Sequence, residues 1–124
     1  MAFLSDSVLD NGLAYIDTNA TRVDICSVEP TTYSQATTSG ANSLGNKTGI
    51  NPAAPADRTG GGRQVTIPAI TDGAVSADGT AAYWALTNGT DTLIATGALS
   101  ASQAVTNGNT FTLDAFEIGI PDAV

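Results

Sequence analysis

The sequence contains no histidine, a single cysteine (Cys26), and only four Lys and Arg residues in 124. Histidine is the commonest general base and metal ligand at neutral pH, so the usual acid–base and metal chemistry lacks its main side chain here. One cysteine can close neither an intramolecular disulfide nor a thiolate metal cage. We therefore expect a protein that is not an enzyme and that binds no cofactor or metal.

Acidic residues outnumber basic ones: twelve Asp and Glu against four Lys and Arg give a formal net charge of −8. Such a chain is repelled by phosphate backbones and by anionic lipid surfaces, which argues against nucleic-acid and membrane partners. The sequence has no apolar run long enough to span a membrane, and its start lacks the pattern of a secretory signal. We expect one domain over residues 1–124, synthesised in the cytoplasm.

Small and β-branched residues are abundant and only 13% of residues are charged, which favours β structure over helix. Four pairs suited to tight hairpin turns divide the second half of the chain: Asp72-Gly73, Asp78-Gly79, Asn88-Gly89 and Asn107-Gly108. The short apolar runs around them predict a small antiparallel β-sandwich or barrel. We expect its strands near residues 63–70, 73–77, 80–87, 92–98 and 109–120.

The first twenty residues have a helical pattern instead. Apolar residues recur at helical intervals at Val8, Leu9, Leu13 and Ile16. With Ser5, Asp6 or Ser7 available to cap the start, this pattern predicts an N-terminal α-helix over about 6–19. The alternating run Arg22–Cys26 then predicts a strand, within a β body formed by residues 21–29 and 63–124. A lone Cys26 on that strand is best interpreted as a small buried hydrophobe.

Residues 30–62 show no periodicity, and a connection of this length is unusual inside a compact domain. One interpretation is a disordered surface loop. The other is a long irregular arm that becomes ordered by lying on a neighbouring subunit. Residues 30–63 carry three bases against one acid, whereas the rest of the chain has one base and eleven acids. This contrast favours the arm, and we expect its interaction residues to be Tyr33, Lys47, Arg58 and Arg63.

The apolar pattern changes parity near the C-terminus. Phe111 and Leu113 have odd numbers, whereas the apolar residues from 116 to 120 have even ones. An apolar face of a strand cannot change parity without an extra residue, so we predict a β-bulge near Asp114-Ala115. The alternative is that one strand ends there and a separate strand follows.

The run Tyr83-Trp84-Ala85-Leu86 is apolar on both faces of its strand. Trp84 and Leu86 would fill the core, which leaves Tyr83 on the opposite face, under the helix or at a subunit contact. Elsewhere, Asp72, Asp78 and Asp91 would be Ca²⁺ ligands only if the turns gathered them, and ordinary turn chemistry explains them more simply.

Several runs resemble a set of small, uncharacterised virion structural proteins of tailed double-stranded DNA phages and prophages. These are the runs 24–33, 62–63, 83–86, 95–100, 109–113 and 118–122. The resemblance implies a component of the virion, with the major capsid protein or other virion proteins as partners. We expect a capsid decoration or cement protein, assembled as a homo-oligomer and by analogy a trimer.

Two other functions remain open from the sequence. A tail, fibre or baseplate-associated module would have the same composition and the same lack of catalytic groups. A carbohydrate-binding β-sandwich would use Tyr15, Tyr33 or Tyr83 to stack on sugars.

Overall fold

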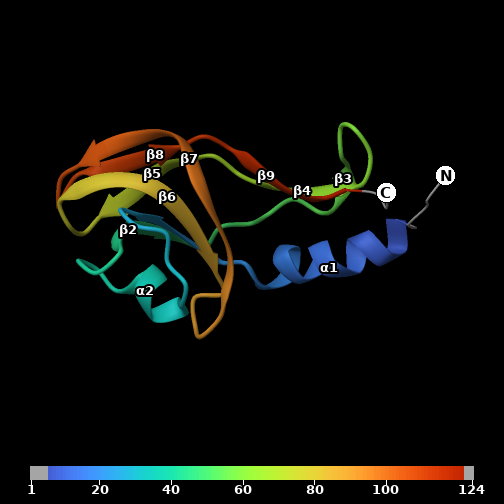
Figure 1. Ribbon diagram of the computed structural model, residues 1–124, viewed down its shortest axis with the longest axis horizontal. Helices are drawn as coiled ribbons and strands as arrows, with labels where there is room; N and C mark the ends of the chain where they lie inside the picture. The colour runs from blue at the N-terminus through green and yellow to red at the C-terminus, as the bar shows by residue number, and fades with distance from the viewer. Residues whose placement is uncertain (1–5, 122–124) are drawn as a thin grey trace.

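The computed structural model describes residues 6–121, with side chains described from residue 10 onward. Two helices and nine strands are arranged along this part of the chain (Figure 1). In order they are α1 (Asp6–Asn19), β1 (Arg22–Cys26), α2 (Tyr33–Thr37), β2 (Ser43–Thr48), β3 (Ala56–Asp57), β4 (Arg63–Ile67), β5 (Ile70–Val75), β6 (Gly79–Thr87), β7 (Leu93–Val105), β8 (Thr110–Leu113) and β9 (Phe116–Ile120).

The strands form two antiparallel sheets. The larger has the order β7-β6-β1-β2-β5-β8 and curls into a half-barrel, while the smaller has the order β3-β4-β9 and lies beside α1 (Figure 1). The mainly β architecture with an N-terminal α-helix is therefore confirmed.

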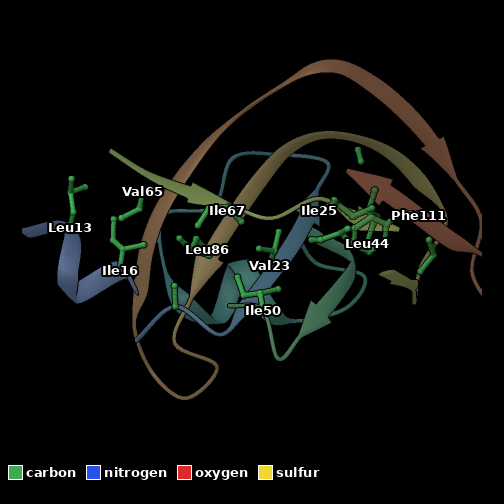
Figure 2. Close-up of a cluster of buried hydrophobic side chains, with 14 residues drawn as sticks. Leu13, Ile16, Val23, Ile25, Leu44, Ile50, Val65, Ile67, Leu86 and Phe111 are labelled. Carbon is green, nitrogen blue, oxygen red and sulfur yellow. The ribbon is translucent and has the colours of Figure 1, made fainter. Parts of the chain in front are cut away.

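Helix α1 occupies the predicted residues 6–19 and packs against β4 and β9 of the smaller sheet. Leu13 and Ile16 are buried there, close to Val65 of β4 (Figure 2). At the end of the helix, the Asn19 side-chain amide donates to the Tyr15 carbonyl at 2.9 Å. The side chains of Asp6, Val8 and Leu9, on which the prediction also relied, lie outside the described ones.

Strand β1 is covered on both faces, and so is the middle of β6. Val23 and Ile25 point into the main core, which Figure 2 shows extending from Leu13 to Phe111. Cys26 lies on the opposite face, in a small cluster with Ala36 of α2 and Ala85. Trp84 and Leu86 join the main core, while Tyr83 packs on the α2 side. The two-faced placement of residues 83–86 is thus confirmed, but the helix on the Tyr83 side is α2 and not the predicted N-terminal helix.

The expectation of an extended arm over 30–62 is wrong. Residues 33–37 form α2, and residues 43–48 form β2, which is hydrogen-bonded between β1 and β5 inside the larger sheet. The run 43–48 has little apolar alternation because the two faces of the strand make different kinds of contact. Leu44 enters the apolar core on one face, while the Ser43 hydroxyl on the other face donates to buried Asp24. Gly45 allows close approach to β5, since a Cβ there would lie 2.5 Å from the Ala74 carbonyl oxygen.

The predicted bulge at Asp114-Ala115 is also wrong, and its alternative is correct: β8 ends at Leu113 and β9 begins at Phe116 in the other sheet. The pairing register is the same on both sides of this break, because Ile67 pairs with Phe116 and Ile70 with Leu113. Pro68 lies opposite the break, and its lack of an N–H divides the strand predicted at 63–70 into β4 and β5.

Candidate functional site

The two sheets end in strands with open edges. β7 and β8 are the end strands of the larger sheet, and β9 is an end strand of the smaller one. Between residues 6 and 121, no strand pairs with the outer edge of any of the three. β7 is the longest strand, at 13 residues, and contains neither a charged residue nor a proline. Natural proteins normally protect so long an edge with charges, prolines or covering segments.

A groove runs along the seam where these edges face each other. Its volume is about 620 Å³, and it is lined by residues 98–103 of β7, by residues 112–116 of β8 and β9, and by Trp84. One side chain spans the seam: the Gln103 amide nitrogen (Nε2) donates to the Thr112 carbonyl oxygen at 3.1 Å. In a continuous sheet, the backbone of an adjacent strand would donate a hydrogen bond to such a β8 carbonyl. Here the Gln103 side chain donates it instead.

The pairing of β7 with β6 is irregular along the same groove. Gln103 pairs with Ala81 and Ala98 pairs with Tyr83, so residues 99–102 have only Ala82 opposite them. This irregularity leaves residues 99–102 without register partners in β6. Most of the β7 residues that line the groove are therefore unpaired with β6, while Ala98 and Gln103 at its two ends are paired.

Aromatic and aliphatic side chains form the floor of the groove. The Trp84 and Phe116 ring centroids are 4.4 Å apart with an interplanar angle of 33°. Trp84 also lies against its cross-strand partner Gly97, where an added Cβ would come within 2.6 Å of the indole ring. Leu99 and Leu113 continue the apolar surface towards the core. Because Phe116 and Gly97 both contact the indole, little of the ring is left as a platform for a ligand.

The electrostatics of the groove are simple. Asp114 is the one ionisable side chain among its lining residues, and it is exposed. The rest of the rim carries neutral polar groups, namely Ser100, Ser102, Gln103 and Thr112. In a chain of net charge −8, this surface favours a partner that is apolar with some positive charge.

The three bases assigned to the arm make contacts within the chain. The Lys47 ammonium contacts Asp72 at 2.9 Å, and this contact lowers the Asp72 pKa. The Arg63 guanidinium contacts Asp10 at 2.8 Å and Asp57 at 2.6 Å.

The remaining arm contact and the two predicted aromatic residues are also placed by the structure. The Arg58 guanidinium donates to the Gly61 carbonyl at 3.0 Å. Tyr33 is the first residue of α2, and Tyr83 packs against the small cluster formed by Cys26, Ala36 and Ala85. Both tyrosine side chains are partly buried. None of the five predicted interaction residues lines the groove, and their part in an interface stays a prediction.

A buried ionic network joins β1, β2 and α2, and sequence reasoning missed it. Asp24 is fully buried and accepts two hydrogen bonds from Arg22, at 2.6 and 2.9 Å. The Ser43 hydroxyl donates to the same carboxylate at 2.6 Å, and Arg22 also donates to the Thr37 carbonyl. The hydrogen bond to Asp24 raises the Arg22 pKa, against an opposing effect of burial. The available signal was the Arg-x-Asp spacing, which puts both side chains on one face of a strand.

Cys26 lies beside this network, and its burial, as predicted, is confirmed. Desolvation, with a smaller effect of the Asp24 charge, raises the pKa of its thiol to about 12. The side chain is therefore protonated at physiological pH, and a nucleophilic role would need its thiolate form.

The three aspartates considered as Ca²⁺ ligands each have a separate partner. Asp78 accepts from the Asn107 backbone N–H at 2.7 Å, Asp91 accepts from the Asn88 amide at 2.9 Å, and Asp72 contacts Lys47. The structure gathers no three His, Cys, Asp or Glu side chains into a metal-binding group within its described part.

No protein-family model, curated protein or solved structure matches this chain. Among the described helices, none is long and apolar enough to cross a membrane.

Proposed function

We propose that this protein is a structural component of a phage particle, a decoration or cement protein that binds the outer shell. The phage assignment rests on the sequence resemblance described above. The binding role is supported by one observation: a long, uncharged strand edge borders an apolar groove at an open seam. An edge of this kind offers a row of backbone donors and acceptors to another chain.

The seam takes the place of the arm in this proposal. Lys47, Arg58 and Arg63 make their polar contacts within the protein's own chain, so they are poorly placed to be the main shell contacts. Each copy would instead contribute one groove contact of modest strength. Because a shell presents many equivalent sites, modest contacts on linked subunits add up to firm attachment. The partners would be the major capsid protein or another virion protein.

The test is the copy number of the protein in purified particles of the phage that encodes it, measured by quantitative mass spectrometry. Hundreds of copies per particle support a decoration protein. A few to a few dozen copies would replace it with a tail, fibre or baseplate component. Absence from the particle would overturn the virion assignment.

Particles lacking the gene provide the functional control. Under this proposal they assemble but lose their DNA at lower temperature than wild-type particles, and added purified protein restores heat resistance. Unchanged heat resistance would contradict a reinforcing role. The homotrimer expected by analogy is tested separately, by the mass of the 12.4 kDa chain's assembly in solution.

A further inference from the structure

We infer that the seam between β7 and β8–β9 binds an extended segment of a different protein, inserted as an additional strand. In this segment apolar side chains alternate with small polar ones, and a Lys or Arg lies beside Asp114. The inference rests on the proposed function for the source of the segment, and on the groove alone for its chemistry.

The strand edges on both sides of the seam can pair with an additional strand. β7 and β8 are the two ends of one curled sheet, so a segment lying between them would pair with both and close the half-barrel. Closure removes open edges, which is the usual solution in small β proteins. The Gln103–Thr112 hydrogen bond identifies a β8 carbonyl that already accepts a hydrogen bond from across the seam. Residues 99–102 lack partners in β6, so they can adjust to a new neighbour.

The side chains of the groove select what the segment carries. Successive residues of a strand point to opposite faces, so every second residue of the segment would point at the floor formed by Trp84, Leu99, Leu113 and Phe116. The residues between them would point outward to solvent. At the β8–β9 end of the groove, Asp114 is exposed and is the one charge in the lining, so a cation is favoured there.

Two other occupants fit less well. A second copy of this chain would bring another net charge of −8, and its own open strand β7 carries no cation for Asp114. A sugar would need an exposed aromatic face, but the Trp84 ring is stacked by Phe116 and lies against Gly97. A strand needs only the ring edge and the aliphatic surface.

Trp84 is the single tryptophan of the chain, so its fluorescence reports directly on groove occupancy. The probes are acetylated and amidated octapeptides without Trp or Tyr, with Val or Ile alternating with Thr or Ser. One outward position carries Lys, Gln or Glu in turn. Matched control peptides carry N-methyl groups on alternate residues, which block backbone donation along one edge.

With the full-length chain, we expect a saturable change in Trp84 emission as peptide is added. At low salt the Lys peptide should bind roughly threefold to fivefold more tightly than the Gln peptide, which is the effect expected of an exposed ion pair. The Glu peptide should bind most weakly and the N-methylated peptides should not bind. Asp114→Lys should reverse the preference. Its control, Asp17→Lys, makes the same charge change on α1, which contributes no residue to the groove.

A second pair of variants tests the location. Ala101→Leu adds bulk at an exposed lining position and should abolish binding, whereas Ala54→Leu, exposed outside the groove, should leave it unchanged. Circular dichroism and melting confirm that each variant is folded.

Several results would overturn the inference. One is the absence of any saturable change at about 1 mM peptide, the weakest affinity worth measuring. Others are equal binding of N-methylated peptides, a response to oligosaccharides such as cellohexaose instead, or an emission change that depends on protein concentration alone. Because none of these measurements uses particles, failure here leaves the copy-number test of the proposed function intact.

Discussion

Gly73 is a position where a single added methyl group should be costly. It lies on β5 directly opposite Phe111 of β8, and the phenyl ring lies over it. An alanine Cβ at this position would come within 2.3 Å of two ring carbons, whereas ordinary contacts begin at 3.4 Å. Phe111 is only 2% exposed, so the ring has little room to move. Overpacking of this kind costs about 1–3 kcal/mol, and we expect the Gly73→Ala substitution to reach the upper part of that range.

Urea denaturation monitored by circular dichroism measures this cost. Gly12→Ala is the matched control, because there the added Cβ would meet only the tip of Ile120 at 3.3 Å. Replacing a helical glycine by alanine also gains about 1 kcal/mol of helix propensity, so Gly12→Ala should be neutral or stabilising. The Gly73→Ala, Phe111→Leu double variant lacks the phenyl ring that the new methyl group would meet. Its loss of unfolding free energy should therefore be smaller than the sum of the losses in the two single variants. A Gly73→Ala protein as stable as wild type, or strictly additive losses, would contradict a clash between position 73 and the Phe111 ring.

Three further predictions concern the titratable groups. Asp24→Ala leaves Arg22 and Ser43 without their carboxylate partner and should cost about 3 kcal/mol in urea denaturation; Asp72→Asn, which removes only the exposed contact with Lys47, should leave the midpoint nearly unchanged. Because the pKa of the Cys26 thiol rises from its ordinary value of 9.0 in the unfolded chain to about 12 in the folded one, the stability it contributes is complete below pH 9 and should fall as pH rises towards 12. A Cys26→Ala variant should show a flatter loss over that window. At pH 8 the native thiol should react with a disulfide reagent far more slowly than the urea-unfolded chain, and equal rates would contradict its burial.

Local patterns in the sequence were sufficient for several elements. The spacing of Leu13 and Ile16 predicted α1 correctly, because one face of that helix packs on a single sheet. The Asn88-Gly89 and Asn107-Gly108 turns likewise separated β6 from β7 and β7 from β8. The turn predicted at Asp72-Gly73 is wrong, because both residues lie inside strand β5, where Gly73 makes room for the Phe111 ring.

Strand β2 could not be predicted in this way. Its residues are small or polar, and their partners are supplied by other segments: Asp24 for Ser43, and the β5 backbone for Gly45. Tertiary hydrogen bonding there outweighs weak strand propensity. The arm prediction failed for a related reason, because the partners of its residues lie far away in the sequence. Arg63, for example, forms an ion pair with Asp10, which is 53 residues away.

The candidate site was harder still to foresee. The groove is formed by β7 and by the β8–β9 junction, which meet only because the sheet curls. Trp84 was correctly assigned to the core, but its place on the floor of the groove depends on Gly97 and Phe116 together. Open strand edges are a property of sheet order, and sheet order cannot be read from one strand's sequence.

A cryo-electron microscopy reconstruction of the intact particle, at a resolution that traces backbone, tests the proposed role and binding site together. We expect this protein on the outer shell, with an extended segment of a capsid protein lying between β7 and β8 above Trp84. A reconstruction in which the protein is bound through another surface while the seam faces solvent would contradict this expectation.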